Sequence, residues 1–228
     1  SLPYVVSIAD VQGTGSDSPY DGYSVVTWGV VTGSYGTHFA MQDGNGTRSG
    51  VWVRGSASPA EGDSVTVRGL VTENADVDYA GTTMLVDAVV ESLSPGATVP
   101  SAAVVTTLAA ASEDYEGVLV TVEDAVCTDA NVGSGAWEVD DGSGSVRVDD
   151  MGYAFQPSLG TSYDVTGPAV CVDGAHALEP RSAGDIVWAG DAAAPSIYTV
   201  FAESETTALI TFTEPVDEAT SEAAGNYS

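Results

Sequence analysis

The residues of this chain best suited to chemistry are carboxylates close to flexible glycines. Asp140 and Asp141 open an Asp-Asp-Gly-Ser-Gly turn, and Asp149 and Asp150 follow one short strand-like run later. Their hard oxygens are the ligands that Ca²⁺ prefers, although the alternating spacing and final Glu of an EF-hand loop are missing. We expect either a weak calcium site at these four residues or an acidic, solvated hairpin.

No other residue type forms a catalytic pattern. The two histidines, His38 and His176, have no Cys or His at the spacing of metal ligands. The sequence also lacks a Gly-x-Ser-x-Gly elbow, a His-Glu-x-x-His motif and a phosphate-binding glycine loop. We therefore expect a protein that is not an enzyme and requires no cofactor, with Ca²⁺ as the one candidate ligand.

Three residues are candidates for covalent modification. Cys127 and Cys171 each follow a short β-like run, which favours a cross-strand disulfide over a metal site; the alternative is two buried free thiols. Asn45 begins an Asn-Gly-Thr glycosylation acceptor at a predicted turn. The alternative at Asn45 is an Asn-Gly pair chosen for the geometry of the turn.

Aromatic side chains of the first half could form a stacking platform for single-stranded nucleic acid, as some β-barrels do. The candidates are Trp28, Trp52, Tyr35 and Phe39. Trp28 and Trp52 lie in apolar β-like runs, however, so packing in a core or between modules is the commoner fate.

Charge argues against nucleic-acid binding as well. The chain has 33 Asp and Glu against 5 Lys and Arg, all five of them Arg, and a formal net charge of −28. Proteins that bind nucleic-acid phosphates or anionic lipids need clustered cations, so we expect neither nucleic acid nor a membrane surface as a partner. No apolar run approaches the roughly 20 residues needed to span a bilayer. We expect a protein of the extracellular space or the cell surface, whose self-repulsion is screened by salt or divalent cations.

Hydrophobic periodicity places these residues on β-strands. Short runs rich in Val, Thr and Tyr are interrupted by Gly, Asp, Asn or Pro every eight to twelve residues, which is typical of all-β proteins. The one helix-like stretch is the Ala-rich segment 106–112.

The chain also repeats itself. Four blocks recur in the same order with similar spacing, which indicates two copies of one module of roughly 95 residues joined near Ser94-Pro95-Gly96. The matching blocks are 22–31 with 117–126, 39–46 with 137–144, 50–54 with 145–149, and 59–69 with 157–167.

Each copy contains five strand-like runs with an Asp-Gly-x-Gly or Asp-Gly-Ser-Gly turn between the second and third. Five short antiparallel strands in a Greek-key barrel form the OB architecture. We expect OB-fold modules at 1–95 and 96–190, and an incomplete Ig-like β segment at 191–228. Because the first and fourth OB strands are neighbours, this topology also favours the disulfide between Cys127 and Cys171.

The first 190 residues resemble a known class of modules. Ile8–Gly13, Gly22–Val31, Met41-Gln42-Asp43 and Gly62-Asp63 are similar to the OB-fold region that precedes the catalytic domain of large secreted bacterial and archaeal nucleases. Leu178–Arg181 and Asp185-Ile186 resemble the end of the second such module. In that family the hydrolytic residues lie in a separate downstream domain, so the resemblance does not imply nuclease activity here. Similar modules occur in surface proteins without a nuclease.

The last segment resembles a different family. Ala194–Phe201 and Ala208–Asp217 are similar to the first two strands of bacterial surface-layer Ig-like domains, and Asn226-Tyr227-Ser228 resembles the motif that follows them. Two strands do not make a sandwich, so Ile197, Val200, Leu209, Ile210 and Phe212 need another strand to cover them. That strand comes either from the same polypeptide or from a neighbouring chain.

Two functions follow as expectations. The first is a structural component of an extracellular filament, matrix or surface layer, self-associating through β-module packing and strand complementation. The second is an accessory OB-fold region that presents nucleic acid or polysaccharide to a catalytic domain outside this sequence. The first module has 3 Arg against 11 acidic residues, the second 2 against 15, and the tail 0 against 7, which favours the structural function.

Overall fold

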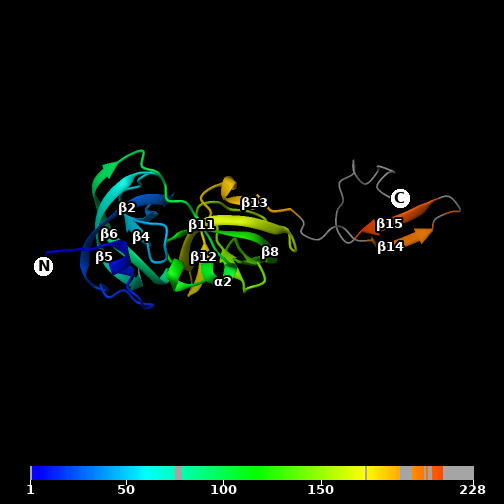
Figure 1. Cartoon of the computed structure of the whole chain (residues 1–228), viewed down its shortest axis with the longest axis horizontal. Helices are drawn as coiled ribbons and strands as arrows, with labels where there is room; N and C mark the ends of the chain where they lie inside the picture. The colour runs from blue at the N-terminus through cyan, green and yellow to red at the C-terminus, as the bar shows by residue number, and fades with distance from the viewer. Residues whose placement is uncertain are drawn as a thin grey trace. The chain divides into compact units, whose positions relative to one another are not determined.

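The chain divides into two compact units in the computed structural model, residues 1–190 and residues 191–228 (Figure 1). The structure describes residues 2–74, 79–172, 174–190, 197–202, 204 and 207–212.

The first unit begins with a β-barrel in which five strands form a closed ring, β2-β3-β4-β6-β5-β2. All ring contacts are antiparallel except that between β4 and β6. A short strand β1 adds to β2 in parallel. The strands are β1 (Tyr4–Val5), β2 (Ser24–Tyr35), β3 (His38–Gln42), β4 (Gly50–Gly55), β5 (Ser64–Asn74) and β6 (Ala80–Ser94).

A second barrel closes in the same way, as β8-β9-β10-β12-β11-β8. Only the contact between β10 and β12 in this ring is parallel. Two short strands, β7 and β13, add to its edges. The strands are β7 (Ala103–Val104), β8 (Leu119–Gly133), β9 (Ala136–Asp140), β10 (Val146–Val148), β11 (Ser162–Val172), β12 (Ala175–Leu178) and β13 (Ile186–Trp188).

These two rings confirm the predicted all-β fold with tandem OB-like modules. The four repeated sequence blocks map onto equivalent strands of the two rings, because β2, β3, β4 and β5 correspond to β8, β9, β10 and β11. The glycine-rich turns join the second strand to the third in both barrels, as predicted.

Each barrel is preceded by a short helix that contributes to its core. In the first, α1 (Ile8–Gln12) begins at Ser7, whose side chain forms a capping box with Asp10, and Ile8 and Val11 are buried in the barrel. In the second, α2 (Thr107–Ala110) lies in the predicted helical stretch and buries Ala110. Two 3₁₀ turns complete the helical elements, η1 (Glu113–Tyr115) and η2 (Ala183–Asp185).

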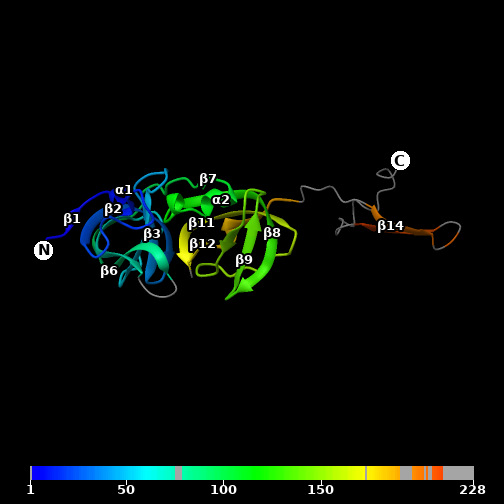
Figure 2. The same cartoon turned by 90° about the horizontal axis from the view of Figure 1, so that it is seen from below.

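Three apolar clusters stabilise the unit. One lies inside each barrel, built from side chains that alternate inward along the strands. The third lies between the barrels, where the outer face of β3, β4 and β6 packs against β11 and β12 (Figure 2). The two modules therefore form one body rather than two independent domains.

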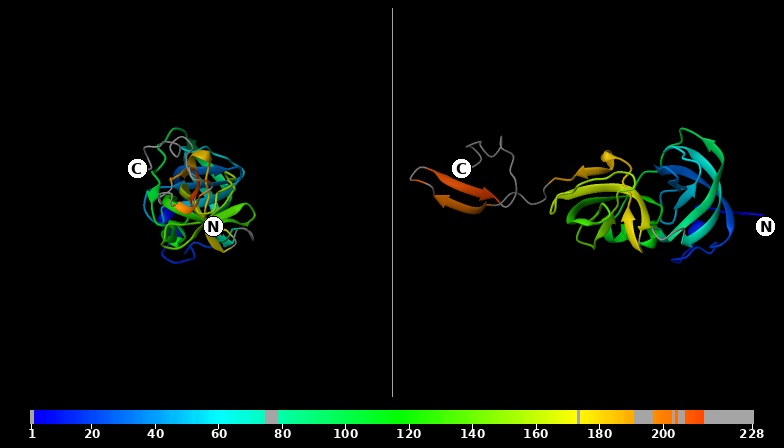
Figure 3. Two further views of the ribbon diagram at one scale, coloured as in Figure 1. Left: turned by 90° about the vertical axis from the view of Figure 1, so that its right-hand side faces the viewer. Right: turned by 180° about the vertical axis from the view of Figure 1, so that it is seen from behind.

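The second unit contains one described β-hairpin, β14 (Ile197–Ala202) with β15 (Ala208–Phe212), seen from behind in the right panel of Figure 3. Val200 pairs with Ile210, and Phe201 pairs with Leu209. Among the described residues no third strand joins this hairpin. Asn226 and its sequence motif lie outside the described residues.

The expected disulfide is wrong, because Cys127 and Cys171 are both free and buried. Their strands are neighbours, as predicted. However, the Cys127 amide donates to the carbonyl of Thr161, just before β11, whereas Cys171 lies ten residues further along. Ten residues of strand span roughly 30 Å, whereas bridged Cα atoms lie within about 7 Å. The topology identified adjacent strands, but not that the two cysteines lie at opposite ends of the pair.

Backbone contact between the barrels requires glycine at two positions. A Cβ atom built on Gly50 would lie 2.1 Å from the carbonyl of Gly117, and one on Gly117 would lie 2.5 Å from the carbonyl carbon of Gly50. No relaxation of a flexible side chain can relieve these clashes, because backbone atoms meet on both sides. The close approach of η1 and β8 to β4 thus depends on these residues.

We predict that Gly50→Ala destabilises the unit by about 1–3 kcal/mol, the usual cost of overpacking a well-packed region. Chemical denaturation followed by tryptophan fluorescence measures the change. Gly46→Ala is the matched control: the same substitution in the turn before β4 meets nothing within 4 Å and should leave the free energy of unfolding nearly unchanged. Equal effects of the two substitutions would contradict the proposed contact.

Candidate functional site

The acidic turn uses its carboxylates to hold its own backbone. Asp140 Oδ1 accepts hydrogen bonds from the amides of Gly142 and Gly144. Asp141 accepts from the amide and hydroxyl of Thr107, at 3.0 and 2.7 Å, and so ties the turn to the start of α2. Burial raises the pKa of Asp141, but hydrogen bonds from Ser143 and Thr107 outweigh it and lower that pKa to about 2.

Asp149, a third calcium candidate, has partners of its own. Asp149 Oδ1 accepts from the amide of Asp150, and its Oδ2 lies 3.4 Å from an Arg147 guanidinium nitrogen. Within the described part of the chain, no three or more His, Cys, Asp or Glu side chains are arranged to hold a metal ion. Calcium binding at Asp140, Asp141, Asp149 and Asp150 thus stays a prediction, without a preformed cluster to support it.

The remaining predicted residues lie apart from one another. Asn45 is exposed in the turn between β3 and β4, where a glycan could be attached, and glycosylation stays a prediction. His38 packs its ring on Tyr79 at 5.1 Å between centroids, and His176 lies half-buried in β12. Neither histidine belongs to a metal-binding group in the described residues.

The four aromatic candidates do not form a stacking platform. Phe39 is buried in the first barrel, and Trp52 is fully buried between the barrels, as the packing alternative predicts. Tyr35 also reaches the interface, where its hydroxyl donates to the carbonyl of Glu179 at 2.7 Å. Only Trp28 differs, since 47% of its surface is exposed on β2.

Several side-chain-to-backbone hydrogen bonds cross the interface between the two modules. Trp52 Nε1 donates to the carbonyl of Ala169 at 2.8 Å, and the Leu119 amide donates to Gln42 Oε1 at 2.7 Å. The Thr82 hydroxyl donates to the Cys171 carbonyl at 2.7 Å and accepts from the Cys171 amide at 3.0 Å. These bonds join backbone groups of one barrel to side chains of the other, so they fix the position of the two barrels relative to each other.

Two arginines close the rim of this interface. Arg48, in the turn before β4, donates to Asp114 Oδ1 at 3.0 Å and to three backbone carbonyls of residues 12–15. Arg181, beyond β12, donates to the carbonyl of Thr32 at 3.0 Å and to Glu61 at 3.2 Å. Because each of these two arginines bonds to the other module, both contribute to holding the modules together.

A nearly inaccessible carboxyl, Glu116, lies at the centre of the interface. Its Oε1 accepts from the amide of Thr83 in the other module at 2.8 Å, whereas its Oε2 has no hydrogen-bond partner. Burial first, and then the nearby Glu113 and Glu73, raise the pKa of Glu116 well above its ordinary value, against opposing hydrogen bonds from Thr83 and Gln12.

Protonation would turn the unpaired Oε2 of Glu116 into a hydrogen-bond donor. Gln12 interacts with this carboxyl, and Gln12 Oε1 is a second buried atom without a partner. Two acceptors cannot satisfy each other, but a protonated Glu116 can donate to Gln12 Oε1. Burial thus favours the protonated form of Glu116 over the carboxylate.

A neighbouring carboxyl is affected in the same direction. Burial raises the pKa of Glu113 to about 7, although Arg48, 3.9 Å away, lowers it. The interface therefore contains carboxyls that retain protons at a pH where exposed ones are ionised.

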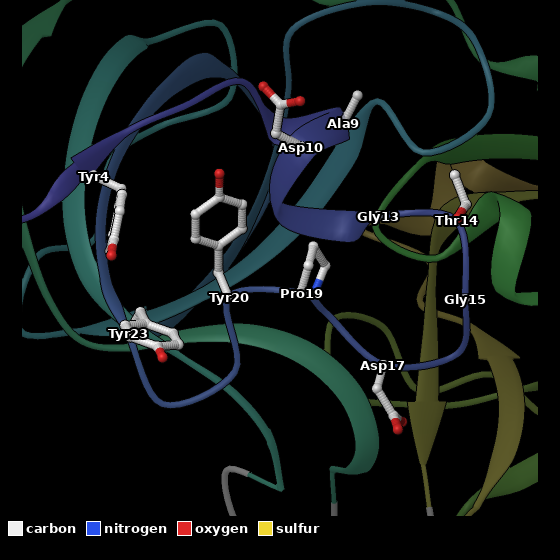
Figure 4. Close-up of a pocket in the computed structure, with 10 residues that line it drawn as sticks. All are labelled: Tyr4, Ala9, Asp10, Gly13, Thr14, Gly15, Asp17, Pro19, Tyr20 and Tyr23. Carbon is white, nitrogen blue, oxygen red and sulfur yellow. The ribbon is translucent and has the colours of Figure 1, made fainter.

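Two surface pockets lie on the first barrel. The larger, of about 680 Å³, is lined by tyrosines and acidic residues beside α1, as Figure 4 shows. The smaller, of about 430 Å³, lies beside Trp28 and is bounded by Asp43, Asn45 and residues 98–101 of the connection between the modules.

Sequence reasoning missed the interface acids and the tyrosine pocket. In the sequence Glu116 is one carboxylate among many. The one signal that distinguishes it is its position directly before Gly117, the first residue of the repeated block 117–126. Tyr4, Tyr20 and Tyr23 were detectable as three tyrosines within twenty residues of turn-rich sequence.

Comparisons with protein-family models, with curated protein sequences and with solved structures found no match to this chain. Over the described residues, none of the helices combines the length and the apolar character needed to cross a membrane.

We predict that Glu116→Gln stabilises the protein at pH 8. An acid whose pKa is raised by folding contributes most stability below its unfolded pKa, near 4.5, and loses that contribution as the pH rises through the folded pKa. Glutamine keeps the acceptor for Thr83 and gives a permanent donor towards Gln12. The gain at pH 8 should be about 1–3 kcal/mol, the usual penalty of an unsatisfied buried group.

The measurement is urea denaturation at pH 4 and pH 8. The difference between Glu116→Gln and the wild type should shrink towards pH 4. Glu123→Gln, on an exposed position of β8, removes the same charge from the surface and serves as the control. A variant that is less stable than the wild type at pH 8 would show that Glu116 acts as an anion.

Proposed function

We propose that this chain is a non-catalytic structural component of an extracellular assembly, such as a filament, matrix or surface layer. In this proposal the tandem OB-like unit is a rigid block, and the hairpin of the second unit joins one subunit to the next by strand complementation. No catalytic step is assigned to the chain.

The observation that carries the proposal is the exposure of the hairpin on both faces. Phe201 and Leu209 are cross-strand neighbours on one face, 67% and 53% exposed, and Val200 on the opposite face is 61% exposed. A hairpin that packs on one side only would keep polar residues on the other. Apolar residues on both faces favour burial on both, which another strand or sheet must supply.

The side chains of Ile197, Ile210 and Phe212 lie outside the described residues, although their backbone belongs to the hairpin. They are part of the proposed contact through their positions on β14 and β15. The contact is head-to-tail, because a hairpin of one subunit would join a different surface of the next, and such contacts build filaments unless the rotation closes a ring.

Support also comes from the face that OB-like barrels commonly use for ligands. Nucleic-acid and oligosaccharide binding usually takes place on the second and third strands. In the first barrel these are β3 and β4, whose outer residues Ala40 and Trp52 are fully buried against the second barrel. The second barrel thus covers the surface on which other OB-like barrels bind a ligand.

Removing residues 191–228 tests the proposal. The remaining unit, 1–190, is compact, so it should stay folded and monodisperse while assembly of the full chain is lost. Light scattering and negative-stain electron microscopy over a range of NaCl and CaCl₂ concentrations would measure the assembly.

A double variant, Phe201→Ser with Leu209→Ser, keeps the chain length and should also abolish assembly. Thr211→Ser, at an exposed position of the same hairpin, should leave it intact. A full-length chain that remains monomeric in every condition, or assembly that survives the deletion, would refute the proposed role of the hairpin.

The second candidate is an accessory binding region of a secreted nuclease or other hydrolase whose catalytic domain lies outside this sequence. The resemblance of residues 4–190 to such modules and the exposed Trp28 beside its pocket favour it. Neither surface pocket is lined by a basic residue, however, so the electrostatic part of nucleic-acid binding is missing there.

We therefore predict no saturable binding of single-stranded DNA at physiological salt in a fluorescence anisotropy titration. Trp28→Ala should not change the result. Tight, salt-sensitive binding that Trp28→Ala removes would instead support the accessory function and argue against the structural one.

A further inference from the structure

The groove beside α1 combines aromatic rings with acidic side chains. Tyr4 comes from β1, while Tyr20 and Tyr23 come from the connection between α1 and β2 (Figure 4). Its volume, about 680 Å³, is in the range of small-molecule sites. Its lining residues Gly13 and Gly15 accept hydrogen bonds through their carbonyls from Arg48, at the rim of the module interface.

The rings are held in fixed orientations. The ring centroid of Tyr4 lies 5.5 Å from that of Tyr20 and 5.7 Å from that of Tyr23, with interplanar angles of 64° and 87°. Edge-to-face packing of this kind restricts each ring. Tyr4 and Tyr23 nevertheless remain half exposed, so aromatic surface is open to a ligand.

The charge of the groove selects the ligand. In Figure 4 both acidic residues lie on the same side of the three tyrosines, Asp10 on α1 and Asp17 on the loop after Gly15, and no basic side chain lines the groove. The faces of tyrosine rings attract cations within about 6 Å, and carboxylates add to that attraction. A phosphate or sulfate would instead meet negative potential in a chain of net charge −28.

We propose that this groove binds a small organic cation of the alkylammonium class, for which the trimethylammonium group of choline is the simplest probe. The alkyl groups contact the tyrosine rings and Pro19, and the charge is balanced by Asp10 and Asp17. No covalent step is involved.

A second copy of the chain is a poor source of this cation. The sequence contains no lysine. All five arginines already have partners in the folded chain, so a second copy has no free side-chain cation to offer. Those arginines are Arg48, Arg54, Arg68, Arg147 and Arg181.

The test is a titration of the full-length protein with choline chloride monitored by isothermal titration calorimetry, which does not require the protein to be monomeric. The neutral isostere 3,3-dimethylbutan-1-ol has the same shape without the charge. We expect saturable choline binding that weakens with added NaCl, and binding of the isostere that is about tenfold weaker, equivalent to about 1.4 kcal/mol.

Variants locate the site. Tyr4→Leu and Tyr23→Leu should each weaken choline binding about two- to fivefold, as expected for loss of one ring at an exposed cation site. Asp17→Asn should weaken it as well, and Asp17 is preferred to Asp10 because Asp10 forms the capping box of α1. Trp188→Leu, which removes an exposed aromatic ring from the second barrel, is the control and should change nothing.

Three results would overturn the proposal. They are the absence of saturable choline binding, equal affinity for choline and its neutral isostere, and choline binding that Tyr4→Leu and Tyr23→Leu leave unchanged. None of these results depends on whether the protein forms an assembly, so they are separate from the test of the proposed function.

Discussion

Burial of one barrel's outer face against the other is the constraint on which the rest of the first unit depends. Trp52 is the clearest case, because its ring is fully buried between the modules and its Nε1 donates to the Ala169 carbonyl. A buried tryptophan without that acceptor would leave its N–H unsatisfied. The contact between Gly50 and Gly117 and the placement of Glu116 both require the barrels in this position.

Electrostatics and packing are linked at this interface. Two of the five arginines, Arg48 and Arg181, lie where the modules meet, and each binds backbone carbonyls as well as carboxylates. The acids that remain inside are affected by burial more than by any cation, so their pKa values rise. Burial thus favours the protonated forms of Glu116 and Glu179, whereas the buried Asp185 is paired with Arg181.

Strand order could be predicted because it follows local patterns: alternating apolar residues, glycine-rich turns and the order of the repeated blocks. Positions along a strand pair could not be predicted. Cys127 and Cys171 illustrate this, since the sequence predicted that their strands are neighbours but not that the two residues lie at opposite ends. Trp28 and Trp52 illustrate the same limit, because both occupy apolar β-runs and only the packing of the second module decides which ring is covered.

The packing of the two barrels is directional, and this has a consequence for the equivalent face of the second barrel. The first barrel uses the face of its second and third strands, where Ala40 and Trp52 are cross-strand partners. At the equivalent positions of the second barrel stand Glu138 and Arg147, which are also cross-strand partners. A charged pair on this face is costly to bury under another barrel, much as the polar outer face of a terminal repeat ends a solenoid. The outer face of β9 and β10 is therefore less suited to packing against another barrel than the face of β3 and β4.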